Sequence, residues 1–141
     1  AMQRRAQHAA GPRAAGAQAR GGSWPGSLLA DWEWRPAAKE ARTRGERFVL
    51  TQLNTASELV SESAAMHHCV SSYAAKCIAG YASIWALRRM ALGKTERLLT
   101  IELDRQQRAV QVRGFANRLA TPEERKILER WAKARGVMLP G

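Results

Sequence analysis

Two runs of residues in the second half of the chain alternate between apolar and polar side chains. In residues 97–103, one side carries Leu99, Ile101 and Leu103, and the other carries Leu98, Thr100 and Glu102. In residues 109–114, the alternation sets Val110 and Val112 against Gln111 and Arg113. A short polar loop at 104–108 joins the two runs. Period-two alternation on both sides of a short loop predicts an antiparallel hairpin with one buried face.

The register of this hairpin decides which polar side chains meet. The apolar faces match when Ile101 pairs with Val112, and strand side chains alternate strictly. The same register therefore gathers polar side chains on the second face: Thr100 opposite Arg113, and Glu102 opposite Gln111. That face is either an ordinary solvated surface or part of a functional site.

The remaining patterns predict an α+β domain. Residues 81–89 form a third strand-like run ending in Arg88 and Arg89, and a meander would bring one of these to the polar face. Thr121, Pro122 and two glutamates open a C-terminal helix that ends at Gly136. The predicted order is one or two helices, then a three-stranded antiparallel meander, then a C-terminal helix packed on the sheet. Residues 48–53 fit either a short strand or the lead-in to a helix.

The region between Thr55 and Gly80 has two possible interpretations. Thr55 and Glu58 fit a capping box that starts a helix. If the helix runs unbroken to residue 79, its stripe of Leu59, Met66, Val70, Tyr73 and Cys77 faces the core, and His68 points away from it. A break near Ser63 instead places His67 and His68 at the start of a second helix. Gly80 ends the helical region in both cases.

Composition divides the chain into three parts. Residues 1–30 contain no Asp or Glu and are rich in Ala, Gly and Arg, which predicts a disordered basic tail or linker. Residues 31–47 form a connector with Trp32 and Trp34, and residues 48–141 form the folded domain. Together with Trp24, these tryptophans either stack on bases or anchor their segment onto the domain.

Charge and cysteine content limit the function classes. A net charge of +11 and a pI near 11.0 favour a polyanionic partner, first nucleic acid and then an anionic membrane surface. Cys69 and Cys77 lack metal-binding spacing, so neither a zinc site nor any other metal or cofactor is expected. Reduced thiols fit a cytoplasmic setting. No apolar run approaches the roughly 18 residues of a membrane span, and no secretory signal is present.

Several spaced motifs resemble the PcfJ-like protein family over roughly residues 48–135. They are Thr55-x-x-Glu58-Leu59-x-x-Glu62, Met66-x-His68-Cys69-Val70-x-x-Tyr73, Gly80-x-x-x-Ile84-x-x-Leu87-Arg88, Thr100-Ile101-Glu102-Leu103 and Gln111-x-Arg113-Gly114-x-x-Asn117. Members tend to have glycine where this chain has Ser63, and its loss weakens the case for a break there. The resemblance implies a bacterial or mobile-element setting, because the namesake belongs to a conjugative transfer system, with protein partners in a transfer complex. It implies no particular chemistry.

The candidate site comprises His68, Cys69, Tyr73, Arg88, Glu102, Arg113 and Asn117. One hypothesis is a nucleic-acid-binding domain in which phosphates contact Arg88, Arg89, Arg113 and Asn117. A second is a metal-independent, ribonuclease-like phosphodiesterase, in which His68 and Glu102 act as acid and base, Arg88 and Arg113 hold the phosphate, and Tyr73 donates a proton or stacks on a base.

A third hypothesis makes Cys69 a nucleophile with His67 or His68 as its base, but neighbours on a helix point about 100° apart. A cysteine inside a helix beside Val70 is more often buried packing. The position of the site decides between the first two hypotheses. If His68, Tyr73, Arg88, Glu102 and Arg113 meet in one pocket, an enzyme is favoured; a flat basic face favours a binding module.

Overall fold

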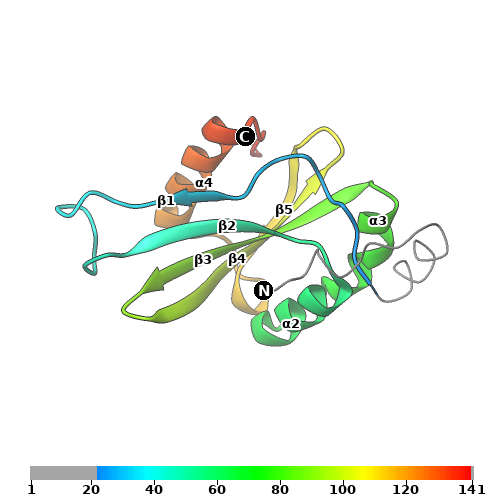
Figure 1. Ribbon diagram of the computed structural model, residues 1–141, viewed down its shortest axis with the longest axis horizontal. Coiled ribbons are helices and arrows are strands. Elements are labelled where there is room, and N and C mark those ends of the chain that lie inside the picture. The colour runs from blue at the N-terminus through cyan, green and yellow to red at the C-terminus, as the bar shows by residue number, and fades with distance from the viewer. Residues whose placement is uncertain (1–21, 141) are drawn as a thin grey trace.

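A single antiparallel sheet of five strands forms the centre of the molecule (Figure 1). The computed structural model describes residues 22–140. The strands pair in chain order as a meander: β1 (Trp32–Trp34), β2 (Arg47–Leu53), β3 (Ala82–Ala91), β4 (Lys94–Asp104) and β5 (Ala109–Arg113). The α+β class is confirmed, but the expectation of three strands was too low. Residues 48–53 belong to a strand, and β1 extends the sheet further.

Helices cover both faces of this sheet. Between β2 and β3 lie α2 (Ala56–Met66), the short 3-10 helix η2 (Ser71–Tyr73) and α3 (Ala74–Ile78). After β5 come a second 3-10 turn, η3 (Phe115–Asn117), and α4 (Pro122–Arg135). Figure 1 shows α4 apart from the α2–α3 pair, with strands between them. The C-terminal helix packs on the sheet as predicted.

The face under α4 is the larger apolar core. Trp85 of β3 and Trp131 of α4 are both fully buried, with ring centroids 5.5 Å apart. Alternate residues of the central strands complete this core, including Leu50, Leu87, Leu99, Ile101 and Leu103. Burial of so many large side chains is the main favourable contribution to folding. The alternating apolar residues of the run 97–103, Leu99, Ile101 and Leu103, lie on this face.

The face under α2 and α3 has a smaller apolar core and a buried polar region. Leu59 of α2 and Cys77 of α3 pack on Ile84 and Ala86 of β3. Beyond this core the buried residues are polar: Glu62, His68, Thr100 and Glu102. The second face of the hairpin is therefore covered, and the interpretation of it as an ordinary solvated surface is wrong.

Two shifts of register change which side chains of the sheet are buried. The predicted pairs are present: Thr100 with Arg113, Ile101 with Val112 and Glu102 with Gln111. Between β3 and β4 the register shifts, so that Leu87 pairs with Leu99 but Arg88 pairs with Arg97. The extra residue, Leu98, joins the core under α4 instead of lying beside Thr100. A second shift leaves Val110 54% exposed, although its alternation predicted a buried position.

The helical region between β2 and β3 is broken, but not at Ser63. Helix α2 ends at Met66, and His67 takes the left-handed conformation (φ 54°) as its C-cap. His67 and His68 therefore follow the first helix and do not start the second. An unbroken helix with His68 facing away from the core is also wrong, because His68 is only 8% exposed. Gly80, with φ 82°, follows α3 as expected.

The tryptophans near the N-terminus anchor their segment. Trp24 is 5% exposed and packs in the core under α2, and Ser23 forms a β-bridge with Thr55. Trp32 and Trp34 pack against the core under α4. Residues 22–30, which composition assigned to the tail, thus lie against the domain, while residues 1–21 are outside the described part. No helix among residues 22–140 is long and apolar enough to cross a membrane.

Candidate functional site

A polar pocket of about 100 Å³ lies where the loop after α2 meets β4, β5 and η3. It contains every predicted site residue except Arg88 and Arg89. The lining residues are His68, Cys69, Val70, Tyr73, Ile84, Thr100, Glu102, Gln111, Arg113 and Asn117. These residues come from segments far apart in the sequence, so folding alone brings them together.

Ser63 fixes the loop that carries His68. The backbone amide of His68 donates to the carbonyl of Ser63 at 3.3 Å, and the amide of Val70 donates to the Ser63 hydroxyl at 2.9 Å. These bonds satisfy carbonyl and amide groups that a helix end leaves without partners. The reversal after α2 turns His68 back toward the sheet, which no helical periodicity could indicate.

His68 belongs to a buried chain of hydrogen bonds. Its Nε2 lies 2.9 Å from the hydroxyl oxygen of Thr100, and that hydroxyl donates to Oε2 of Glu62. Because the single hydroxyl proton of Thr100 is used by Glu62, its oxygen accepts from His68, and we assign the hydrogen on the ring to Nε2. In the neutral ring, Nδ1 is then an acceptor. Glu62 orients His68 through Thr100.

Glu62, which was not among the predicted site residues, connects to His68 through Thr100. Its side chain is fully buried and accepts from Arg88 at 3.1 Å and from Arg97 at 2.7 Å. A signal was present, since Glu62 occurs in the motifs that resemble the family and lies on the same helical stripe as Leu59 and Met66. A carboxylate on a buried stripe requires a polar partner. The meander did bring Arg88 to this face, but as the partner of Glu62 behind the pocket.

Two buried atoms of this network have no hydrogen-bond partner among residues 22–140. They are Nδ1 of His68 and Nη1 of Arg88. Buried polar groups in folded proteins are almost always paired, because an unpaired group keeps the full cost of leaving water. An unpaired acceptor on a residue that lines a pocket is therefore a candidate contact for a ligand.

The pocket wall carries the other groups suited to phosphate chemistry. Arg113 donates to the carbonyl of Val112 at 2.9 Å, and no carboxylate of the described residues pairs with it. Glu102 accepts from Lys76 Nζ at 3.3 Å. The hydroxyl of Tyr73 makes a longer contact, 3.4 Å, with Gln111. The guanidinium of Arg113 and the hydroxyl of Tyr73 are thus available to a ligand.

The two cysteines differ in reactivity. Burial and, to a smaller extent, the nearby charge of Glu102 raise the pKa of the Cys77 thiol to about 12 against the opposing effect of Lys76, so this thiol stays protonated. Cys69 is exposed and lies in the loop after α2, so the expectation of a buried cysteine inside a helix is wrong. Among residues 22–140, no three His, Cys, Asp or Glu side chains gather as metal ligands.

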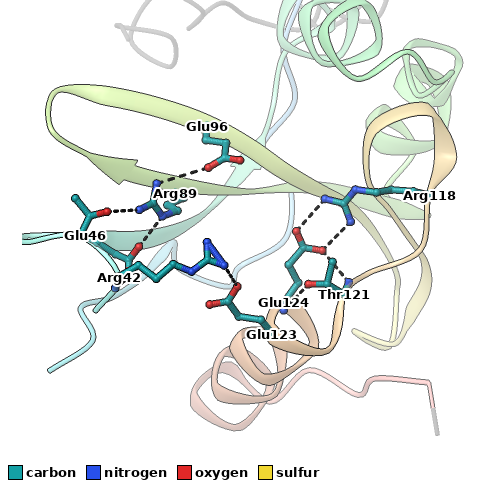
Figure 2. A network of polar contacts seen from close by, with 9 residues as sticks. Arg42, Glu46, Arg89, Glu96, Arg118, Thr121, Glu123 and Glu124 are labelled. Carbon is teal, nitrogen blue, oxygen red and sulfur yellow. Dashed lines mark hydrogen bonds and ion pairs between the residues drawn. The ribbon is translucent and has the colours of Figure 1, made fainter. Parts of the chain in front are cut away.

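Arg89 lies away from the pocket in a separate polar network. Figure 2 shows its guanidinium directed at Glu46 and Glu96, with Nε 2.5 Å from Glu46 and Nη1 3.6 Å from Glu96. Its Nη2 also donates to Thr43 at 2.8 Å. These contacts connect β3 and β4 to the segment before β2. Arg89 therefore does not line the pocket.

Fold and site together define an α+β domain whose five-stranded meander carries a pocket of histidine, tyrosine, glutamate and arginine. The family model described as PcfJ-like protein matches residues 6–129 of the chain. The chain therefore belongs to the PcfJ-like protein family, and the match begins well before the expected residue 48. No curated protein and no solved structure matches the chain significantly.

Proposed function

We propose that the domain is a metal-independent phosphodiesterase that cleaves RNA at this pocket. The observation that carries the proposal is the chain from Glu62 through Thr100 to His68, which leaves Nδ1 of a pocket histidine as a buried acceptor without a partner. A histidine held in one tautomer by a carboxylate-anchored bond is the arrangement that general-base catalysis requires. A binding surface alone needs no such chain.

The proposed reaction uses the ribose 2′-OH as the nucleophile. Nδ1 of His68 takes the 2′-OH proton, O2′ bonds to phosphorus, and the bond from phosphorus to O5′ breaks. Tyr73 gives its hydroxyl proton to the departing O5′. Exchange with water then returns a proton to Tyr73 and removes the one that His68 took. The products are a 2′,3′-cyclic phosphate and a 5′-OH end.

The other pocket groups bind the phosphate. Arg113 supplies a guanidinium without a carboxylate partner, which suits two-point contact with phosphate oxygens. Asn117 adds an amide at the pocket wall. Glu102 already accepts from Lys76, which makes Tyr73 the better-placed proton donor.

The test is cleavage of a labelled single-stranded RNA, beside DNA of the same sequence, in EDTA. Wild type should cleave the RNA and leave the DNA intact. His68→Gln keeps a donor near Thr100 but removes the acceptor at Nδ1, so its rate should fall about 10²- to 10⁴-fold. Tyr73→Phe should also lose activity, and Tyr81→Phe, the chain's other tyrosine, is the matched control.

A non-catalytic nucleic-acid-binding domain is the second candidate, favoured by the net charge of +11. It predicts intact RNA together with salt-sensitive binding of both RNA and DNA. The bacterial or mobile-element setting that the resemblance implies, with protein partners in a transfer complex, applies to both candidates. Cleavage that is equal in wild type and His68→Gln would contradict the catalytic proposal.

A further inference from the structure

An aromatic pair stands at the edge of the pocket. The rings of His67 and Phe115 lie 4.6 Å apart between centroids and are tilted by 38°. Both residues are exposed, Phe115 by 50%. His68, which follows His67, and Asn117, which lies two residues after Phe115, line the pocket itself. Because burial of a phenylalanine ring is favourable, core packing does not explain its exposed position beside a polar pocket.

The backbone that carries this pair is held in an unfavourable conformation. His67, Ala116 and Asn117 have φ values of 54°, 53° and 65°, in the left-handed region that residues with a Cβ rarely adopt. Such conformations persist where the surrounding structure fixes them, and they concentrate at functional sites. Here the fixing contacts are visible: the Gly114 amide donates to the Arg118 carbonyl at 2.7 Å, and the Asn117 amide donates to the Gly114 carbonyl at 3.0 Å.

The η3 turn is also secured from behind. The guanidinium of Arg118 bonds both carboxylate oxygens of Glu124 and the carbonyl of Leu98. Figure 2 shows this guanidinium facing the carboxylate of Glu124 at the start of α4. A Cβ at Gly114 would lie 2.6 Å from the Arg118 guanidinium, so glycine permits this close approach. The η3 turn that carries Phe115 is therefore held by contacts to both β4 and α4.

We propose that His67 and Phe115 form a stacking subsite for an unpaired nucleobase next to the phosphate held in the pocket. The inference rests on the proposed function and specifies its substrate class as single-stranded RNA. Aromatic side chains stack on bases of any sequence because every base has a π-face. Bases inside a duplex are stacked on their neighbours and cannot reach an exposed ring.

The test measures binding by fluorescence anisotropy, with a short single-stranded RNA and an abasic ribose-phosphate oligomer of equal length as probes. Phe115→Ala should raise the Kd for RNA about tenfold and leave the Kd for the abasic oligomer unchanged. Phe115→Trp should restore tight binding. Tyr81→Ala removes an aromatic ring that is 57% exposed and outside the pocket lining, and should have no effect.

The binding data keep this inference separate from catalysis. In the cleavage assay, Phe115→Ala should raise KM and retain kcat, while His68→Gln should lose kcat and still bind RNA. If wild type binds RNA as predicted but cleaves none, the proposed function fails and the subsite stands. If Phe115→Ala binds RNA as tightly as wild type, the subsite is overturned whatever the cleavage. Phe115→Leu, which keeps apolar packing, replaces Phe115→Ala if that variant does not fold, and the same outcomes apply.

Discussion

Two glutamates on opposite faces of the sheet are held by the same kinds of partner, a threonine and arginine, yet their networks differ in completeness. Glu124 bonds Arg118 through both carboxylate oxygens at 2.9 Å and exchanges hydrogen bonds with Thr121 in a capping box. Glu62 bonds Thr100 and two arginines. The first network closes on itself, whereas the second leaves buried atoms of His68 and Arg88 without partners among the described residues.

Completeness of pairing distinguishes a purely structural network from one that can accept a ligand. Burial of charge is unfavourable, and a buried ion pair is weak support for stability. In the network of Glu124, the hydrogen bonds to Arg118 and Thr121 offset this cost. They also connect the residue after η3 to the start of α4 (Figure 2). The network of Glu62 includes His68, a residue that lines the pocket and has a buried Nδ1 without a partner among the described residues, which is a pattern expected where a ligand completes the pairing.

The largest effect is expected from Glu62→Gln. Loss of this charge leaves Arg88 and Arg97 without their counter-ion on a covered face, and removal of one partner from a buried pair costs about 3–5 kcal/mol. Urea denaturation measures the loss. Glu124→Gln, the matched change on the other face, should cost less because the Arg118 side chain is 38% exposed, whereas Arg88 in the Glu62 network is only 21% exposed. Equal losses in the two variants would remove the distinction between the networks.

Thr100→Val should break the chain of hydrogen bonds from Glu62 through Thr100 to His68, with a smaller effect on stability than Glu62→Gln. The valine keeps the shape of threonine but leaves Nε2 of His68 and Oε2 of Glu62 without their partner, at a cost of about 1–3 kcal/mol. Since the ring then loses its fixed tautomer, kcat for RNA cleavage should fall while the protein remains folded. Thr95→Val, on the exposed part of the same strand, is the control. Full activity in Thr100→Val would show that this chain of hydrogen bonds is not needed for cleavage.

Acid should weaken the network of Glu124. Burial raises the pKa of this carboxyl, but hydrogen bonds from Arg118 and Thr121 lower it by more, so the net pKa lies below the usual 4.5. Its pairing therefore stabilises the fold above pH 4.5, and this contribution is lost as pH falls through the lowered value. The difference in unfolding free energy between wild type and Glu124→Gln, about 1–2 kcal/mol near neutral pH, should shrink in acid. A difference independent of pH would contradict the assignment.

Thiol labelling, the smallest perturbation, tests which of the two cysteine side chains is accessible to a reagent. Cys69 is exposed at the lining, whereas Cys77 is buried behind it with its pKa raised to about 12. Only Cys69, which the reagent can reach, should therefore react in the folded protein. A chromogenic disulfide should label one thiol per chain in the folded protein and none in Cys69→Ala. Fast labelling of Cys77 would show that the face under α3 opens to solvent.

Much of the fold was predictable because its signals are local. The order of elements from β3 onward, the start of α4 at Thr121 and the register of β4 with β5 all follow from the spacing of a few neighbouring residues. The number of strands was not predictable, since β1 has only three residues and its pairing depends on β2. Six of the ten residues that line the pocket belong to the candidate set, which was chosen partly through the family resemblance, but Arg88 lies outside the pocket and the position of the pocket was not predicted.

The partners of Glu124 can be inferred from local sequence, because Thr121 and Arg118 lie three and six residues away and a capping box has a recognisable spacing. The partners of Glu62 depend on the tertiary structure. Thr100 lies 38 residues away, and the bulge at Leu98 turns Arg97 toward the same carboxylate. A bulge changes the side-chain period by one residue, and the left-handed turn at His67 reverses the chain. Neither feature can be recognised from the periodicity of the sequence. The role of Glu62 in orienting His68 is therefore apparent only in the folded sheet.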